Sequence, residues 1–228
     1  MVCLPGIRGD ARIFTPLTAL HPAVSWVLLD LPPGGPALAA ARLRSVLPAG
    51  RFHLLTGSFG GLVARFLPAP RIASIACIGT LPSKAFLQPR MIRQAQLLMT
   101  LPDRLLGPLY ERHARRSLTA AGLPLAPVAQ LLDRPIDPPV LRGRLRSVLA
   151  GHHGRVPALP VAWIHGTDDP QITWSRADLQ RAVPHAQVFE VPGGHFPHAT
   201  HPGDLWTSLH HGWWSQIPSA RPTTDPPE

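Results

Sequence analysis

The twelve residues from His53 to Ala64 constrain the fold of this chain more than any other stretch. An apolar run, Phe52 to Leu55, predicts a short buried strand, and apolar residues at helical spacing follow from Leu62 onward. Between them lies Thr56-Gly57-Ser58-Phe59-Gly60-Gly61, a largely small-residue cluster with one serine at its centre. The pattern predicts a strand, a tight turn and a helix, in which the last two glycines let the helix pack closely.

A serine at the apex of such a turn has two interpretations. The turn can hold Ser58 in a strained backbone conformation that exposes its hydroxyl as a nucleophile, which requires small neighbours. The alternative is a glycine-rich strand-to-helix turn of the kind found in many α/β folds, or a phosphate-binding loop. The rest of the chain has to decide between them.

Further strands and helices alternate along the chain. Apolar runs predict strands at Val2–Leu4, Val24–Leu29, Ile72–Gly79, Leu159–His165 and Gln187–Val191. Helical spacing predicts helices at Arg12–Leu20, Leu38–Leu47, Arg176–Val183 and Asp204–Trp214. This alternation is typical of the α/β class, with a mostly parallel sheet covered by helices on both faces.

The alternation is interrupted between Ser83 and Gly154, where no strand-like run occurs. Helices are predicted there at Met91–Met99, Arg104–Leu118, Pro127–Leu132 and Val140–Leu149. Ordinary helical packing would explain them, but an insertion that caps an active site also fits. We therefore expect a core formed by residues 1–82 and 155–217, a helical cap at 83–154, and a flexible proline-rich tail at 218–228.

Composition limits the partners and the compartment. The net charge is +9, but the arginines are scattered and Lys84 is the sole lysine, so we expect no nucleic-acid partner. No run reaches membrane-spanning length and no signal-peptide pattern opens the chain, so we expect no membrane partner and a cytoplasmic protein. Cys3 and Cys77 lie in apolar runs and are expected to be buried free thiols.

A serine nucleophile needs a base to take its proton and an acid to orient that base. The carboxylates of Asp168 and Asp169 follow the Leu159–His165 strand, and His195 follows the last strand after two glycines. Because the carboxyl ends of parallel strands meet at one edge of a sheet, all of these side chains are expected near Ser58.

With serine, acid and histidine in this order, the chain resembles a small single-domain α/β-hydrolase with a helical cap. Four blocks that span Leu4 to His195 carry the resemblance: Leu4-Pro5-Gly6-Ile7, Gly57-Ser58-Phe59-Gly60-Gly61, Gly166-Thr167-Asp168-Asp169 and Gly193-Gly194-His195-Phe196. The chain departs from the family at Thr56, where the G-x-S-x-G nucleophile elbow has its first glycine, and at Pro5, where many members have histidine. Neither change removes a catalytic atom.

The resemblance implies a role for each motif. Ser58 would be the nucleophile, His195 the general base and acid, and Asp169 the carboxylate that orients His195; the G-x-x-D form of the acid turn favours Asp169 over Asp168. The backbone N–H groups of Ile7 and Phe59 would form the oxyanion hole. No cofactor or metal is implied.

The implied activity is hydrolysis of a carboxylic ester or thioester, with a small-molecule acyl substrate and an acyl-enzyme intermediate. The same triad also serves acyltransferases, lyases, C–C hydrolases and cofactor-free oxidation. A non-catalytic binding protein of the same fold is the alternative outside enzymes, and Thr56 is the residue that favours it.

Other conspicuous residues are assigned to the structure and not to the chemistry. His152 and His153 lack a carboxylate or cysteine at ligand spacing, so we expect a solvated loop and not a metal site. His198 and His201 are expected on the surface. Trp213-Trp214 is expected to be the packing face of the last helix. Arg112, Arg115 and Arg116 are expected on a solvated face, although in a pocket they would suit a carboxylate or phosphate group.

Overall fold

The computed structural model describes residues 1–151 and 155–217, and at its centre lies a six-stranded sheet. The strands are β1 Val2–Leu4, β2 Val27–Leu28, β3 Phe52–Gly57, β4 Ile72–Ile78, β5 Val161–Gly166 and β6 Ala186–Val191. They are arranged in the order β2-β1-β3-β4-β5-β6, and each neighbouring pair is parallel. The predicted α/β fold with a mostly parallel sheet is confirmed.

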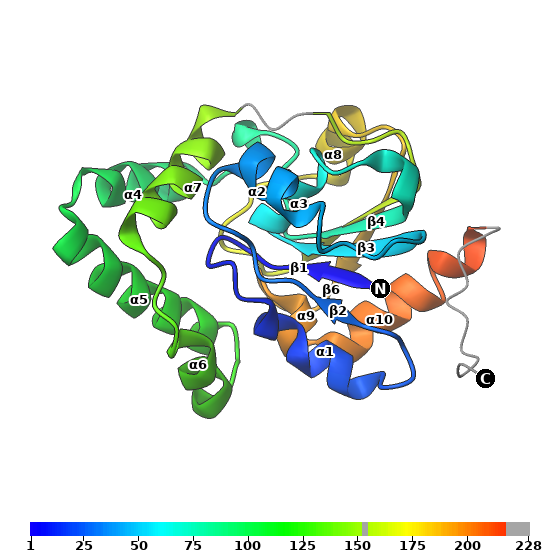
Figure 1. Ribbon diagram of the computed structural model, residues 1–228, viewed down its shortest axis with the longest axis horizontal. Helices are drawn as coiled ribbons and strands as arrows, with labels where there is room; N and C mark the ends of the chain where they lie inside the picture. The colour runs from blue at the N-terminus through cyan, green and yellow to red at the C-terminus, as the bar shows by residue number, and fades with distance from the viewer. Residues whose placement is uncertain (152–154, 218–228) are drawn as a thin grey trace.

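Two helical layers cover the sheet (Figure 1). Their members are α1 Thr15–Leu20, α2 Pro36–Leu43, α3 Phe59–Ala64, α8 Arg176–Ala182, α9 Pro197–Thr200 and α10 Pro202–His210. Helices α2, α3 and α8 pack on one face and α1, α9 and α10 on the other, each layer with its own apolar cluster. Because both faces are covered, the central strands are near-continuous apolar runs.

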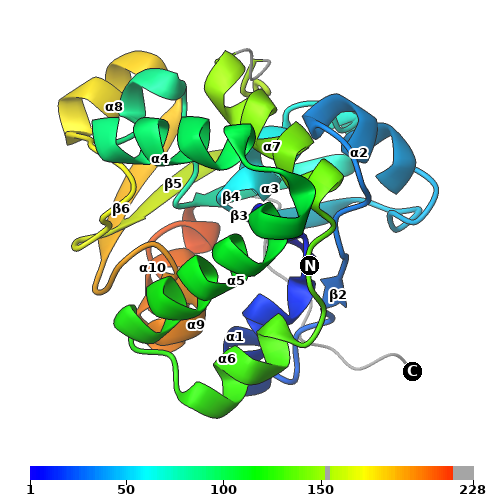
Figure 2. The same cartoon turned by 90° about the vertical axis from the view of Figure 1, so that its left-hand side faces the viewer.

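Four further helices lie together at one end of the sheet (Figure 2). They are α4 Pro89–Thr100, α5 Asp103–Ala120, α6 Leu125–Leu132 and α7 Pro138–Ala150, and we refer to them as the α4–α7 segment. The segment has its own apolar cluster around Leu106, Tyr110 and Leu141. It is tied to the start of the chain by ion pairs of Arg8 with Glu111 and of Arg12 with Asp133.

Several elements differ from their predicted bounds. The strand predicted at Val24–Leu29 pairs only at Val27–Leu28, because it is an edge strand with a short neighbour, β1. The helix predicted at Asp204–Trp214 ends at His210, and a separate 3-10 turn follows at Trp214–Gln216. The predicted tail at 218–228 and the His152-His153 pair lie outside the described residues.

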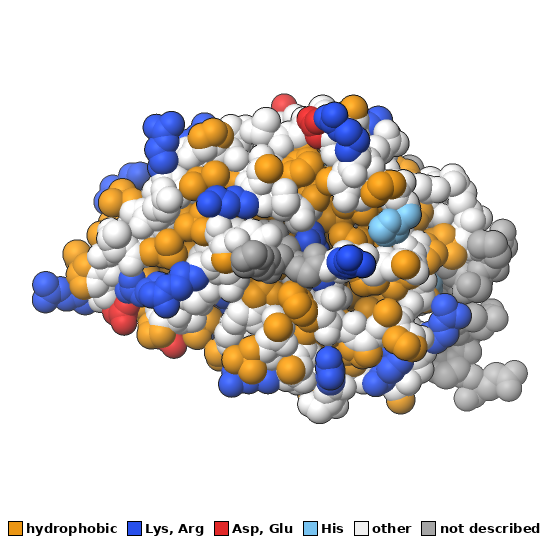
Figure 3. Space-filling model, turned by 90° about the horizontal axis from the view of Figure 1, so that it is seen from above, with side chains coloured by type: hydrophobic (Ala, Val, Ile, Leu, Met, Phe, Trp, Pro, Cys, Tyr) orange, Lys and Arg blue, Asp and Glu red, His pale blue; other side chains and the backbone are white. Residues whose placement is uncertain are grey.

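The remaining expectations from composition concern burial and surface. Cys3 and Cys77 are buried free thiols, and burial raises their pKa to about 12 and about 11. Trp213 and Trp214 are buried in the core, but they follow α10 and are not the packing face of that helix. Lysine and arginine side chains are spread singly over the face in Figure 3, among hydrophobic and uncharged ones. No helix in the described part of the chain is both long and apolar enough to cross a membrane.

Candidate active site

The turn between β3 and α3 holds Ser58 in an unusual backbone conformation. Its φ is +48°, and among the described residues no other non-glycine residue has a positive φ. The Ser58 N–H donates a 2.7 Å hydrogen bond to the carbonyl of Ile78, and the Thr80 hydroxyl donates one of 3.1 Å to the carbonyl of Ser58. The end of β4 and the residue two positions after it therefore fix both sides of a residue whose conformation costs about 1–3 kcal/mol.

Glycines after Ser58 are required by close contacts. A Cβ on Gly60 would lie 2.4 Å from the Leu4 carbonyl oxygen, and a Cβ on Gly61 would lie 2.3 Å from Thr80 Oγ1. By contrast, the position before the turn accepts a β-branched residue. Thr56 is fully buried in the sheet, and its hydroxyl donates a 3.2 Å hydrogen bond to the carbonyl of Ala76 on β4.

The loops that follow β5 and β6 pack directly against each other. A Cβ on Gly166 would lie 2.0 Å from the Gly194 carbonyl oxygen, so only glycine permits this approach. The N–H of Asp168 donates to the carbonyl of Gly193 at 2.9 Å. These backbone contacts bring the residues after Gly166 next to the residues after Gly193.

The result is a hydrogen-bonded pair of Asp169 and His195. Asp169 Oδ2 lies 2.8 Å from His195 Nδ1, and Asp169 Oδ1 accepts a 2.8 Å hydrogen bond from the N–H of Gln171. Burial would raise the pKa of Asp169, but the charge interaction and hydrogen bond with His195, and the Gln171 N–H, hold this pKa below its usual value. Asp169 is therefore an anion at neutral pH, and it holds the proton of His195 on Nδ1 and leaves Nε2 as the acceptor.

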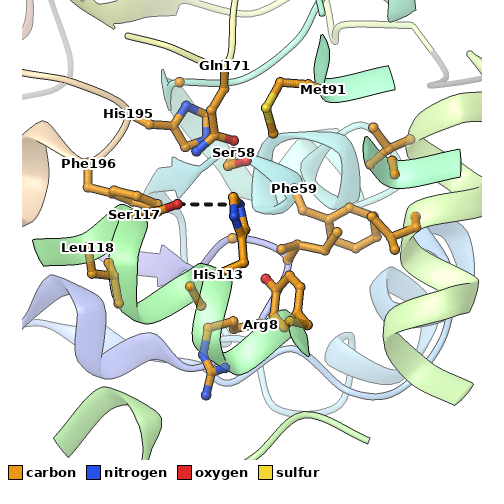
Figure 4. A pocket seen from close by; sticks show the side chains of 18 of the residues that line it. Arg8, Ser58, Phe59, Met91, His113, Ser117, Leu118, Gln171, His195 and Phe196 are labelled. Atoms are coloured by element: carbon orange, nitrogen blue, oxygen red, sulfur yellow. Dashed lines mark hydrogen bonds between the residues drawn. The ribbon is translucent and has the colours of Figure 1, made fainter. Parts of the chain in front are cut away.

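One cavity brings most of the predicted residues together. It has a volume of about 180 Å³, and Ile7, Ser58, Phe59 and His195 all line it, whereas Asp169 lies buried behind His195. Figure 4 shows the Ser58 and His195 side chains facing the same space. Within residues 1–151 and 155–217, the N–H groups of Ile7 and Phe59 donate to no acceptor, so both are free for a ligand.

The sequence itself identifies the family, because residues 1–207 match the alpha/beta hydrolase family. The chain belongs to the alpha/beta hydrolase family. No match was found among curated proteins. The fold of this alpha/beta hydrolase is shared by solved structures at low sequence identity, so these relatives establish the fold and not the reaction.

Three such structures illustrate the range of activities named for proteins with this fold. A thermophilic esterase from Thermogutta terrifontis is 15% identical with a TM-score of 0.71, over 92% of this chain and 88% of that one. The N-acyl homoserine lactonase AidH is 15% identical with a TM-score of 0.73, over 96% and 90%. The bottromycin epimerase BotH is 19% identical with a TM-score of 0.65, over 93% and 89%.

A buried arginine of this alpha/beta hydrolase, not singled out in the sequence, contacts the loop that follows β1. Arg144 on α7 is 1% exposed and donates to the carbonyls of Ile7, Leu31 and Pro32 at 2.6, 2.9 and 3.0 Å. Its guanidinium also lies over the Phe59 ring, 5.7 Å from the centroid. Burial lowers the pKa of Arg144 to about 10, so the group remains a cation at neutral pH.

Two histidines near the site are buried and uncharged. The expectation that His198 lies on the surface is wrong: it is 2% exposed, contacts the Phe14 ring at 4.6 Å, and burial lowers its pKa to about 3. His201 is only half-buried. His165 on β5 stacks on Trp174, and burial lowers its pKa to about 4. The sequence shows these histidines, but their burial depends on distant loops and helices.

The other assignments concern charge and metals. Arg112, Arg115 and Arg116 are exposed on α5 and line neither of the two cavities described for this site, so the expected solvated face is confirmed. Within the described residues no group of three histidine, cysteine or acidic side chains could hold a metal ion. Other polar side chains in the cavity include Gln94, His113 and Ser117, which come from α4 and α5. Their only sequence signal is the i, i+4 spacing of His113 and Ser117 on one helix face.

Proposed function

We propose that this alpha/beta hydrolase is a serine esterase or thioesterase that works through an acyl-enzyme on Ser58. The observation that carries the proposal is the 2.8 Å contact of Asp169 Oδ2 with His195 Nδ1, next to a serine with a φ of +48° in the same cavity. Acyl transfer by a serine requires a buried carboxylate, an imidazole that the carboxylate orients, and a serine held in a strained conformation.

In this mechanism His195 Nε2 takes the Ser58 hydroxyl proton as Oγ attacks the substrate carbonyl carbon. The N–H groups of Ile7 and Phe59 donate to the oxygen that becomes negative, and removing one such donor costs an enzyme about 10²–10³-fold in kcat. His195 then gives its proton to the leaving alcohol or thiol as the bond to the carbonyl carbon breaks. Water, deprotonated by His195, then attacks the acyl carbon; the bond to Ser58 Oγ breaks, His195 returns the proton to Oγ, and the acid leaves.

The α4–α7 segment acts as the cap in this proposal, since its side chains close the cavity opposite Ser58. The cavity wall is mainly apolar, with Leu98, Leu118 and Leu145 among its members, which suits the acyl part of a small-molecule substrate. A cytoplasmic location and the absence of nucleic-acid or membrane partners remain predictions from the sequence.

The test is labelling by a fluorophosphonate, which reacts with an activated serine and not with an inert one. We expect covalent labelling of the wild type at Ser58, no labelling of Ser58→Ala, and a loss of p-nitrophenyl butyrate hydrolysis of about 10⁴-fold or more in that variant. An unlabelled wild type would support the non-catalytic binding protein instead. Labelling without ester hydrolysis would favour acyl transfer, lyase or C–C bond chemistry on the same residues.

A further inference from the structure

The cavity that contains Ser58 adjoins a second one, which is about 470 Å³ in volume and lies toward the loops after β5 and β6. Ser58 lines only the inner cavity, whereas His195 lines both. The inner cavity, with its apolar wall, is where an acyl chain fits. Because His195 also lines the outer cavity, a leaving group that takes its proton from His195 can extend into that cavity.

The boundary between the two cavities is polar but carries no fixed charge. The side chains of Gln94, His113, Ser117 and Gln171 line both cavities. Among the described residues no lysine, arginine, aspartate or glutamate does so. The charged residues each line one cavity only, Arg8 and Asp10 the inner one and Arg90 and Asp168 the outer one. At the boundary itself, an uncharged hydrogen-bonding group finds several partners.

Three of these side chains form a hydrogen-bonded chain opposite Ser58. Gln94 Nε2 lies 3.0 Å from His113 Nδ1, and His113 Nε2 lies 3.4 Å from Ser117 Oγ. Figure 4 shows His113 reaching from α5 toward Ser58, with the dashed bond to Ser117 at its side. Both ring nitrogens of His113 are therefore engaged, and the imidazole is held in one orientation.

The protonation state of His113 decides which atom donates in each of these hydrogen bonds. Burial, together with the charge of Arg116, lowers the pKa of His113, so the ring is neutral near pH 7 and has one donor nitrogen. The amide N–H of Gln94 donates to Nδ1, which places the ring proton on Nε2, and this N–H donates to Ser117 Oγ. The Ser117 hydroxyl proton is then free, because the structure gives Ser117 Oγ no other partner among the described residues.

We propose that Gln94, His113 and Ser117 form a subsite for an uncharged, hydrogen-bonding group on the leaving-group side of the substrate, such as a hydroxyl or carbonyl oxygen next to the ester. The substrate class is thus an ester with an apolar acyl chain and a polar, uncharged alcohol part. This inference rests on the proposed serine hydrolase function, and it adds which half of the substrate the α4–α7 segment recognises.

The test compares two esters that differ in one group, propyl hexanoate and 2-hydroxyethyl hexanoate. We expect the wild type to prefer the hydroxyethyl ester by about tenfold or more in kcat/KM, the size of one net hydrogen bond. Ser117→Ala and, separately, His113→Phe should bring this ratio to within about threefold of one. The control Ser147→Ala removes a hydroxyl on α7 that bonds to the Gly143 carbonyl and lines neither cavity, so it should keep the wild-type ratio.

The ratio does not depend on how much of a variant is folded, because both esters are measured on the same sample. A wild-type ratio near one, or an unchanged ratio in Ser117→Ala, would overturn the subsite while leaving the hydrolase intact. A labelled Ser58 with neither ester hydrolysed would also overturn it. Failure of both labelling and hydrolysis would instead overturn the proposed function, and the subsite with it.

Discussion

Asp168 and Asp169 are adjacent in the sequence, but their surroundings differ. Asp169 is buried against His195, whereas Asp168 is exposed, and among the described residues its carboxylate accepts a hydrogen bond from the Thr167 hydroxyl alone, at 3.3 Å. Asp169→Asn should lower kcat on p-nitrophenyl butyrate on the order of 10⁴-fold, since an amide in place of the carboxylate disfavours the productive tautomer of His195. Asp168→Asn should stay within about twofold. A larger loss for Asp168→Asn would transfer the orienting role to that residue.

Thr56 is the residue at which the turn departs from its usual pattern, and the structure shows how it fits. Its side chain is buried between β3 and β4 and does not line the cavity. Thr56→Val keeps the shape but removes the hydrogen bond to Ala76, so the free energy of unfolding should fall by about 1 kcal/mol. We expect kcat/KM on p-nitrophenyl butyrate to change by less than about threefold. A change beyond tenfold would mean that Thr56 shapes the serine turn.

The sequence was sufficient to predict the site residues that belong to short motifs. The G-x-x-D turn and the order of serine, acid and histidine predicted Asp169 beside His195, and the structure adds that Gly166 meets the Gly193-Gly194 loop at a distance only glycine allows. Arg144 could not be predicted, because its role depends on three carbonyls more than a hundred positions away. The burial of His198 was missed for a similar reason.

At the scale of elements, α7 is joined to the β1 loop through Arg144. Arg144→Met keeps an unbranched stem but removes the guanidinium, so the carbonyls of Ile7, Leu31 and Pro32 lose their donor, which should cost about 2–4 kcal/mol of stability. We also expect kcat to fall by about tenfold or more with KM changed less, because Ile7 carries one of the two N–H groups that face the cavity.

The matched control is Arg146→Met on the same helix, where the side chain is exposed. It should leave both kcat and the thermal midpoint close to the wild type. Arg144→Lys keeps the charge but not the three-way hydrogen bonding, so it should recover only part of the activity. Equal activity of Arg144→Met and the wild type would show that α7 does not position the loop.

At the scale of the whole molecule, buried neutral histidines make stability dependent on pH. His165 and His198 have folded-state pKa values lowered to about 4 and about 3 by burial, below the unfolded value near 6.5. The unfolded chain therefore binds more protons below pH 6.5, and stability is lost as the pH falls. Each histidine should lower the free energy of unfolding by about 1.4 kcal/mol per pH unit between pH 6.5 and the folded-state pKa.

The measurement is the midpoint of urea unfolding at pH 7.5, 6 and 5. His165→Phe keeps a ring on Trp174 and removes two ring nitrogens that have no partner among the described residues, so it should flatten the pH dependence. His211→Gln, at an exposed position, should leave the dependence unchanged. An equally steep dependence in His165→Phe would assign the acid sensitivity to other groups.

The attachment of the α4–α7 segment has a consequence for engineering. Three arginine contacts bind it to the first twelve residues: Arg8 to Glu111, Arg12 to Asp133, and Arg144 to the carbonyl of Ile7. The α4–α7 segment and the loop that contains Ile7 are thus held together by these contacts, although about a hundred positions separate them in the sequence. A chimaera that exchanges residues 83–154 for those of a relative would remove Glu111 from Arg8, leave Arg12 with Asp10 as its partner, and deprive the Ile7 loop of its buried cation. To transfer substrate selectivity from a relative, the exchange would have to include the amino-terminal loop as well.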